Sequence, residues 1–173
     1  MIPVATSSTT STIAGVGLDS MKYSTAWCDI DGDGFVDLWA GAIYRNKGSG
    51  TPRFEQVAGS PQGGTYLRSD ACGDFDGDGA LDLYVGGVGI HRNKRESGDF
   101  DFEAVQDDGI GSAGMGTAVG DYDGDGALDL YVVNFEKHQD TENVLYRNTD
   151  AAVAARGLFV RPVDADGRTH TGW

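Results

Sequence analysis

Aspartate and glycine alternate in a nine-residue pattern, DxDGDGxxD, that occurs three times in the chain. The copies begin at Asp29, Asp74 and Asp121, and their positions are numbered 1 to 9 below. Carboxylates at positions 1, 3 and 5 converge if the backbone curls around a point. The glycine at position 6 permits the sharp turn, and position 7 can offer its backbone carbonyl. Such hard oxygen ligands select Ca²⁺ over zinc or copper, and a flexible coordination number favours Ca²⁺ over Mg²⁺.

The pattern therefore predicts three Ca²⁺ ions per chain, one in each loop. The predicted ligands of the first loop are Asp29, Asp31, Asp33, Asp37 and the carbonyl of Phe35. Those of the second are Asp74, Asp76, Asp78, Asp82 and the carbonyl of Ala80. Those of the third are Asp121, Asp123, Asp125, Asp129 and the carbonyl of Ala127.

Two other readings of the loops are less favourable. A single Asp-Gly pair is commonly a solvated turn. However, two carboxylates some 4 Å apart repel by about 4 kcal/mol at an effective dielectric constant of about 20, so four in one loop favour a bound cation. An EF-hand loop needs a glutamate at position 12, where this chain has Ala40, Val85 and Val132. The aspartate at position 9 is therefore expected to close the cage of ligands.

The loops belong to a longer repeat. They start 45 and 47 residues apart, and each is followed by a second shared element, IYRN, IHRN or LYRN. Two copies then add FEQV from Phe54 and FEAV from Phe102, whereas the third has no obvious counterpart. Leu81, Leu83 and Val85 alternate with other residues in the two-residue period of strands. A period of 40 to 50 residues with several strands is typical of a propeller blade. The chain is predicted to be all-β, with three antiparallel four-stranded blades.

The repeats divide the chain into five parts: a Ser/Thr-rich lead-in at 1–20, repeats at about 21–65, 66–110 and 111–150, and a strand-like segment at 151–173 that could begin a further domain. Three blades cannot close a ring as four to eight do. Apolar positions such as Leu83, Val85, Leu130 and Val132 are therefore expected to be only partly covered. We expect the chain to be a fragment of a longer polypeptide or a subunit covered by neighbours.

Composition excludes several classes of function. Thirteen basic and 27 acidic residues give a net charge of −14, which disfavours binding to nucleic acid or anionic lipid. No stretch approaches the roughly 20 apolar residues of a membrane helix, and the first residues do not resemble a signal peptide. The two cysteines, Cys28 and Cys72, leave two alternatives open, a disulfide or buried free thiols, of which free thiols are favoured.

Other recurring residues are interpreted as structural. Trp39, Tyr84 and Tyr131 share one repeat position, where packing between blades is favoured over a sugar-stacking row. The arginine of each RN element is expected to pair with carboxylates or carbonyls at the blade turns. An insertion at 134–143 is either a mobile loop or a binding loop. We find no catalytic motif and predict no enzymatic activity.

The DxDGDGxxD loops followed by LDLYV and YRN resemble the FG-GAP and VCBS repeats of integrin α-subunit propellers and related secreted proteins. The LYRN element and the segment LFVRPVDADGRTHTGW resemble more closely the cartilage acidic protein type. The resemblance implies calcium-stabilised blades, an extracytoplasmic location and adhesion or scaffold roles. The expected function is a non-catalytic calcium-binding module for protein partners or neighbouring subunits. The alternative is a carbohydrate-binding or hydrolase-associated propeller domain, with a glycan as partner.

Overall fold

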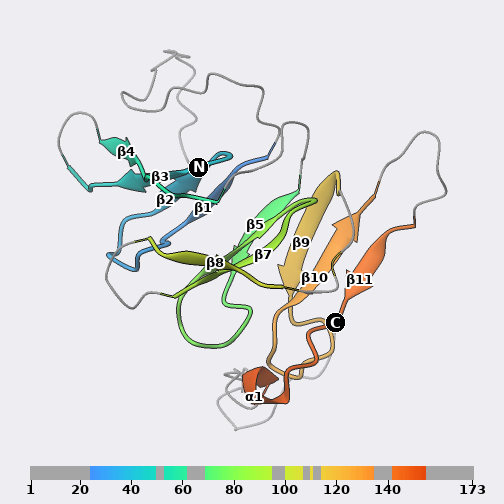
Figure 1. Cartoon of the computed structure of the whole chain (residues 1–173). Helices are drawn as coiled ribbons and strands as arrows, with labels where there is room; N and C mark the ends of the chain where they lie inside the picture. The colour runs from blue at the N-terminus through green and yellow to red at the C-terminus, as the bar shows by residue number, and fades with distance from the viewer. Residues whose placement is uncertain are drawn as a thin grey trace, which may run out of the picture.

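A computed structural model of the chain describes residues 24–49, 53–61, 69–94, 100–106, 110, 114–134 and 142–154. Within these residues lie eleven short strands and one helical turn, arranged as three small sheets side by side (Figure 1). The strands carry the β-branched and aromatic residues that suit a pleated surface, and glycine-rich turns separate them. The predicted all-β fold of three antiparallel blades is confirmed.

Each sheet is one blade, with its strands paired in chain order. Blade 1 consists of β1 Ala26–Cys28, β2 Asp37–Trp39, β3 Ile43–Asn46 and β4 Phe54–Gln56. Blade 2 consists of β5 Asp70–Gly73, β6 Asp82–Val85, β7 Gly89–Asn93 and β8 Phe102–Ala104. Blade 3 has three strands within the described residues, β9 Gly116–Gly120, β10 Asp129–Val133 and β11 Val144–Tyr146. The acidic loop joins the first two strands of every blade.

Strand register is the same in every blade. The residue before the loop lies opposite the aspartate at position 9, as in the pairs Cys28 with Asp37 and Gly73 with Asp82. The asparagine of the RN element lies opposite the phenylalanine of the fourth strand in both blades that have one. Register decides which face of the sheet a side chain occupies. Equivalent residues therefore lie on the same face of their blade, either toward the preceding blade or toward the following one.

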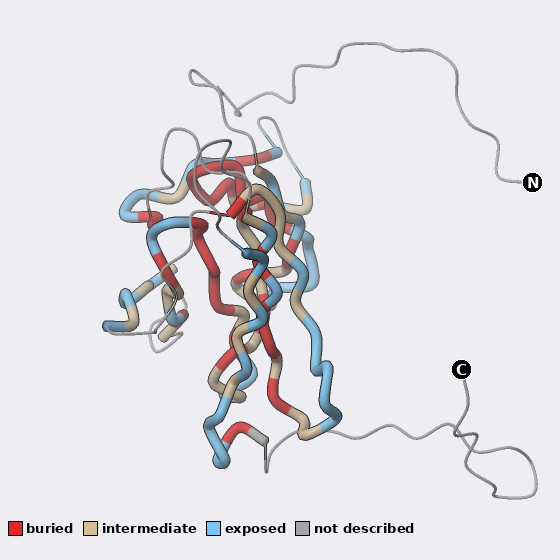
Figure 2. The backbone as a smooth tube through the Cα atoms, turned by 90° about the vertical axis from the view of Figure 1, so that its right-hand side faces the viewer, coloured by how far each residue is buried: buried red, intermediate tan, exposed pale blue. Residues whose placement is uncertain are grey.

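Two hydrophobic clusters fill the spaces between the blades. The first lies between blades 1 and 2 and contains Cys28, Ile30, Trp39, Ile43, Leu83 and Val85. The second lies between blades 2 and 3 and contains Phe75, Tyr84, Leu130 and Val132. The first strands meet along the inner side, with β1 against β5 and β5 against β9. Buried segments consequently run through the interior, and exposed segments follow the edges (Figure 2).

The expected partial exposure of four apolar residues is wrong. Leu83, Val85, Leu130 and Val132 are each 3% exposed or less. These side chains point toward the preceding blade, which covers them. The uncovered apolar face is instead the opposite side of blade 3, where Tyr131 is 39% exposed and Leu145 45% exposed.

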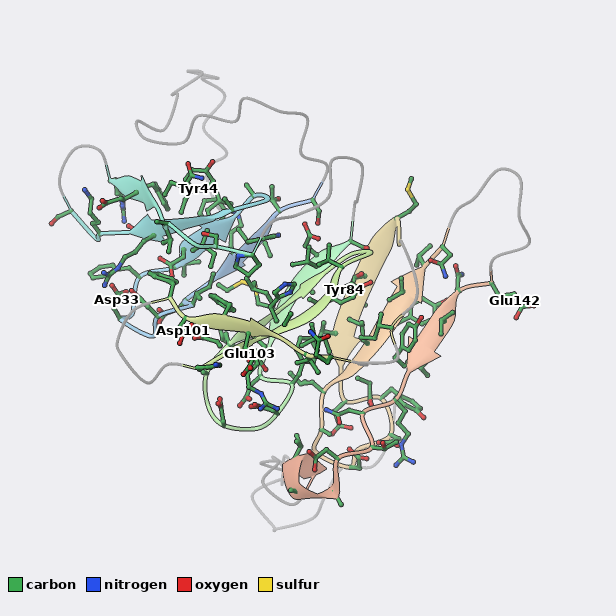
Figure 3. All side chains as sticks on the ribbon, in the orientation of Figure 1. Asp33, Tyr44, Tyr84, Asp101, Glu103 and Glu142 are labelled. Carbon is green, nitrogen blue, oxygen red and sulfur yellow. A yellow bond between two sulfur atoms is a disulfide. The ribbon has the colours of Figure 1, made fainter. Side chains whose placement is uncertain are left out.

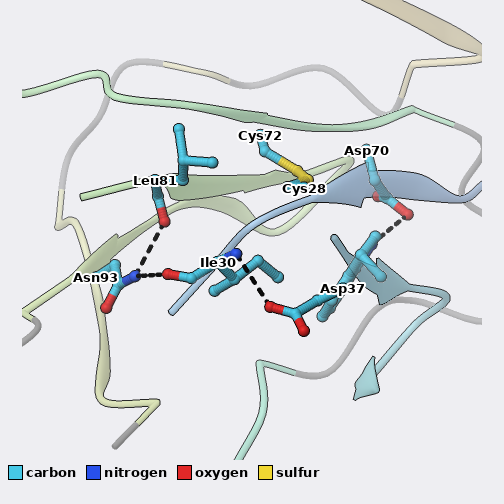
Figure 4. The surroundings of a disulfide bond; sticks show 8 residues. Cys28, Ile30, Asp37, Asp70, Cys72, Leu81 and Asn93 are labelled. Atoms are coloured by element: carbon cyan, nitrogen blue, oxygen red, sulfur yellow. Dashed lines mark hydrogen bonds between the residues drawn. A yellow bond between two sulfur atoms is a disulfide. The ribbon is translucent and has the colours of Figure 1, made fainter. Parts of the chain in front are cut away.

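A disulfide between Cys28 and Cys72 joins β1 of blade 1 to β5 of blade 2 (Figure 4). The preference for free thiols is therefore wrong. Cys28 stands one residue before its loop and Cys72 two residues before the next one. Successive side chains of a strand point to opposite faces, so these two positions face each other across the space between adjacent blades. The corresponding contact between blades 2 and 3 brings Gly73 near Val119.

The segment after blade 3 begins as a helix, in contrast to the strand-like segment predicted from residue 151. Helix α1, Ala151–Ala154, follows Asp150, whose carboxylate accepts a hydrogen bond from Ala152 N at 2.8 Å. Val153 is buried against Gly77 in the second acidic loop. The lead-in at 1–20, the central part of the insertion at 135–141 and the rest of the carboxyl-terminal segment lie outside the described residues. None of the described helices is long and apolar enough to cross a membrane.

The disulfide yields a stability prediction. The bridge closes a segment in which the cysteines are 44 residues apart, and restricting that segment in the unfolded chain is worth about 4 kcal/mol in the chain-entropy model. A Cys28→Ala/Cys72→Ala variant should therefore lose about 2–4 kcal/mol of unfolding free energy in urea titrations. Reductant should destabilise the wild type and leave the variant unchanged. A wild type that is insensitive to full reduction would contradict this role.

Candidate metal centres

Glycines at loop positions 4 and 6 give the three acidic loops one backbone shape. Gly32 and Gly34 in the first loop have φ angles of 67° and 89°. Their counterparts have φ angles of 70° and 90° in the second loop and 76° and 94° in the third. These left-handed conformations are strained for residues with a Cβ atom. The DGDG core of the motif therefore meets a conformational requirement at two positions. The requirement at position 6 is predicted from the sequence, and the one at position 4 is seen in the structure.

Backbone N–H groups hold the carboxylates at positions 1, 3 and 5. In the first loop, Gly34 N donates to Asp29 Oδ2 at 2.9 Å and Asp33 N donates to Asp31 Oδ1 at 3.2 Å. Phe35 N donates to Asp33 Oδ1 at 2.9 Å. The same three hydrogen bonds recur in the second loop and in the third. The three side chains are thus fixed by their own loop.

These hydrogen bonds bring carboxylate oxygens together around one point in every loop. Oxygens within 4.8 Å of one another come from Asp29, Asp31 and Asp33, from Asp74, Asp76 and Asp78, and from Asp121, Asp123 and Asp129. In the first loop, Asp29 Oδ1 is buried and has no hydrogen-bond partner among the described residues. A buried carboxylate oxygen without a donor is costly, and a cation would satisfy it.

The aspartate at position 9 links the loop to the sheet. Asp37, Asp82 and Asp129 are at most 2% exposed. One oxygen of Asp82 accepts a hydrogen bond from Phe75 N at 2.9 Å, and the other accepts one from Asn93 N at 2.9 Å. The other two blades have the same pair of hydrogen bonds. The aspartate at position 9 therefore connects loop position 2 to the asparagine of the RN element, in addition to its predicted role as a ligand.

Burial changes the acidity of several loop carboxyl groups. Desolvation is the largest effect at Asp82 and, with the negative charges of Asp76 and Asp78, raises its pKa from 3.8 to about 6. The N–H donors from Asn93 and Phe75 act in the opposite direction. Burial is also the main cause of raised pKa values at Asp31, Asp37 and Asp76. The loops thus hold carboxylates whose charge is unfavourable without a compensating cation.

The arginine of each RN element neutralises part of this charge. The Nε atoms of Arg45, Arg92 and Arg147 lie 2.6 to 2.7 Å from an oxygen of the aspartate at position 3 in their own blade. The predicted pairing of these arginines with carboxylates is confirmed. Four aspartates and one arginine still leave each loop with a formal charge of −3. The donor set, all oxygen and strongly negative, fits Ca²⁺.

The structure places most predicted ligands together, with differences between loops. Positions 1 and 3 belong to the oxygen cluster in all three loops, position 5 in the first two and position 9 in the third. The backbone carbonyls at position 7 stay predicted ligands. Phe35 is 45% exposed, whereas Ala80 and Ala127 are buried, so the side chain at position 7 has different surroundings in the three loops.

Sequence reasoning missed the role of the RN asparagines. Asn93 Nδ2 donates to Ile30 O at 3.1 Å, and Ile30 is position 2 of the loop in the preceding blade (Figure 4). Asn148 Nδ2 makes the equivalent bond to Phe75 O at 2.8 Å. The repeated RN dipeptide was the available signal, but its partner lies 63 and 73 residues away in the two cases. These two asparagines thus join the acidic loop of one blade to the RN element of the next.

A family comparison agrees with this arrangement. Residues 29–85 match the family model of the FG-GAP-like repeat. The matched segment runs from position 1 of the first loop to the end of β6, so it covers two acidic loops and one full repeat period. A comparison with curated proteins found no match. The FG-GAP-like repeat is thus supported over the part of the chain that contains the link between blades 1 and 2.

The raised pKa of Asp82 predicts how stability depends on pH in the calcium-free protein. The pKa is 3.8 for an ordinary aspartate and about 6 in the fold. Between these values the folded state binds more protons than the unfolded state, so stability falls as pH rises through this window. The loss should reach about 3 kcal/mol, and chelator-treated protein should show it in urea titrations from pH 4 to 7.

The matched variant is Asp82→Asn, which keeps the shape of the side chain but does not titrate. Its unfolding free energy should depend less on pH over the same range. Added Ca²⁺ should also flatten the wild-type profile, because a bound cation favours the ionised carboxylate. A calcium-free wild type that gains stability between pH 4 and 6 would exclude the assignment.

Proposed function

We propose that the chain is a non-catalytic, calcium-binding β-propeller repeat module that acts in protein–protein interaction, in an adhesion or scaffold role. The observation that carries the calcium proposal is the common geometry of the three loops. Each has convergent carboxylates, N–H groups that hold them and a residual negative charge. Asp29 Oδ1 is buried and has no hydrogen-bond partner within the part of the chain that the structure describes, so a cation would satisfy it.

Calcium would stabilise the stack of blades as well as the individual loops. Position 2 of each of the first two loops offers its carbonyl to an asparagine of the next blade. Position 2 also donates its N–H to the aspartate at position 9. A cation that fixes the loop therefore fixes the backbone group on which the neighbouring blade is hydrogen-bonded. We propose that the ions set the rigidity of the surface that a partner meets.

The proposed interaction surface is the face of blade 3 that points away from blade 2. Its apolar side chains are exposed: Tyr131 by 39%, Val133 by 38% and Leu145 by 45%. The residues at the repeat positions of Tyr131 in the first two blades, Trp39 and Tyr84, are 0% exposed. Tyr84 lies between the second and third sheets (Figure 3). The aromatic position that is buried between blades elsewhere is thus partly exposed here, which favours a neighbouring subunit or protein partner on this face.

We further propose an extracytoplasmic location and a relationship to the cartilage acidic protein type. The disulfide supports the location, because such bonds persist mainly in oxidising compartments. The LYRN element and the carboxyl-terminal segment support the relationship. In a calcium-rich compartment, dissociation constants of about 10⁻⁴ to 10⁻³ M suffice for occupancy.

The calcium proposal predicts three bound ions per chain and a loss of stability on chelation. When the free Ca²⁺ concentration is 100 times the dissociation constant of a site, binding at that site adds about 2.7 kcal/mol to the unfolding free energy. Metal analysis after dialysis against Ca²⁺, followed by thermal melts with and without chelator, measures both quantities. Fewer than two ions in carefully decalcified and reloaded protein would contradict the proposal.

A pair of variants tests whether the loops hold the ions. Asp78 lies in the oxygen cluster of the second loop, whereas Asp101 lies outside all three clusters. Asp78→Ala should remove one ion and lower the melting temperature in Ca²⁺, whereas Asp101→Ala should retain all three ions. Once chelator is present, the two variants should melt at closer temperatures. Equal calcium content in the two variants would count against the ligand assignment.

The interaction surface predicts a contrast between two tyrosines at one repeat position. Tyr84→Ala should cost about 3 kcal/mol or more, because it opens a cavity between blades. Tyr131→Ala should cost about 1 kcal/mol or less, because the side chain is partly exposed. Light scattering in millimolar Ca²⁺ should show self-association of the wild type that Tyr131→Ala reduces. A wild type that stays monomeric, with a single cooperative melt, would argue against an uncovered docking face.

A further inference from the structure

Two phenylalanines fill part of the space between blades 1 and 2. Phe100 and Phe102 pack against the cluster that includes Ile43 and Leu83. Phe102 is the first residue of β8, and Phe100 stands two residues before it, so both side chains lie on the face of blade 2 that looks toward blade 1. A segment with two aromatic residues, one residue apart, thus completes this interface.

A cavity of about 680 Å³ occupies the equivalent space between blades 2 and 3. Four of its apolar lining residues are repeat counterparts of residues in or against the first cluster. They are Ile90, Val105, Leu128 and Leu130, which correspond to Ile43, Val57, Leu81 and Leu83. The described residues of blade 3 include no counterpart of Phe100 or Phe102. The cavity therefore has the walls of an aromatic site and a volume in the range of ligand pockets.

An arginine borders each of the two spaces at the same repeat position. The Cζ atom of Arg45 lies 5.9 Å from the centre of the Phe100 ring, while its Nε lies 2.7 Å from a carboxylate oxygen of Asp31. Arg92 lines the cavity, and its Nε lies 2.6 Å from a carboxylate oxygen of Asp76. Pairing with a carboxylate therefore leaves the guanidinium able to meet an aromatic ring, whose face attracts a cation.

The charges around the cavity disfavour an anionic ligand. Its two arginines, Arg92 and Arg147, are matched by carboxylates of their own loops. In blades 1 and 2, the lysine after the RN element pairs with a glutamate of the fourth strand, at 3.7 and 3.1 Å. The corresponding residue of blade 3 is Thr149, followed by Asp150, and both line the cavity. A segment that enters here needs no acidic residue, and the net charge of −14 favours a basic one.

We propose that the cavity between blades 2 and 3 binds a segment of a partner protein that carries two phenylalanines, one residue apart, and flanking basic residues. One ring meets the guanidinium of Arg92 as Phe100 meets Arg45. The apolar walls enclose the other ring. The inference rests on the proposed role in protein–protein interaction, but it names a second site, on the face of blade 3 opposite to Tyr131.

A fluorescent peptide tests the proposal on the full chain in millimolar Ca²⁺. The probe is Lys-Phe-Ser-Phe-Ser-Ala-Val-Lys, which is the sequence of residues 100–105 with serine at its two acidic positions and a lysine at each end. Fluorescence anisotropy should show saturable binding, and alanine in place of both phenylalanines should weaken it at least about tenfold. Equal binding of the two peptides would overturn the proposal. Absence of binding, as expected if a segment of this chain fills the cavity, would overturn it as well.

A matched pair of variants locates the site. Val105 lines the cavity and is half-buried, whereas Val88 is 51% exposed and lies outside the lining. Val105→Trp should obstruct the cavity and weaken peptide binding at least about tenfold, whereas Val88→Trp should bind like the wild type. Thermal melts check that both variants fold. Equal affinities would overturn the proposal, and self-association of the wild type that Val105→Trp abolishes would assign the cavity to a second copy instead.

Arg92→Lys tests the ring contact independently of the tryptophan variants. Lysine keeps the charge beside Asp76 but lacks the planar group that stacks on a ring. It should weaken binding of the phenylalanine peptide about two- to fivefold, and it should leave the affinity of a cyclohexylalanine peptide unchanged. An equal effect on both peptides would overturn the contact. Ca²⁺ content and self-association are measured separately, so a chain that shows both but does not bind the peptide refutes this site alone.

Discussion

The aspartate at loop position 9 is the group on which the rest of each blade depends. Its two oxygens accept hydrogen bonds from the loop and from the RN asparagine, so a single buried carboxylate ties together a hairpin turn and the third strand. Burying a charge is costly unless it is hydrogen-bonded or paired. The chain meets that requirement with backbone donors and places three more carboxylates close by, which makes a cation favourable at the same point.

Loop and stack are coupled through the residue at position 2. Its N–H binds the aspartate of its own blade, and its carbonyl accepts the asparagine of the next blade. Its side chain enters the cluster between blades, as Ile30 and Phe75 do. The polar and apolar parts of the interface therefore meet at one residue. In the first two loops, position 2 therefore links the loop to the neighbouring blade both by a hydrogen bond and by packing.

Most of the fold was predictable because the repeat presents the same local chemistry three times. Loop glycines, strand alternation and the RN arginine pairs each depend on residues close together in the sequence or at fixed repeat positions. The sequence did not predict the hydrogen bonds of the RN asparagines, nor that the two cysteines form a disulfide instead of remaining free thiols. The two residues in each of these contacts are 44 to 73 residues apart in the sequence. Such contacts depend on how blades face each other. The helical turn at α1 was missed because the apolar residues that follow it dominate the strand-like pattern of that segment.

Exposure at equivalent positions shows what the repeat pattern leaves undetermined. Trp39, Tyr84 and Tyr131 are aromatic residues at one repeat position, yet the first two are fully buried and the third is 39% exposed. The residue type at this position is set by the need to fill the space toward the following blade. Burial, in contrast, depends on whether a neighbour is present. The same reasoning applies to a cavity of about 680 Å³ between blades 2 and 3, beside β11. Ile90 and Val105 of blade 2 line this cavity, and their counterparts in blade 1, Ile43 and Val57, belong to the cluster that contains Phe100 and Phe102. A repeat protein thus encodes each surface for its neighbour, so an uncovered surface of this kind indicates the shape and chemistry of what packs against it.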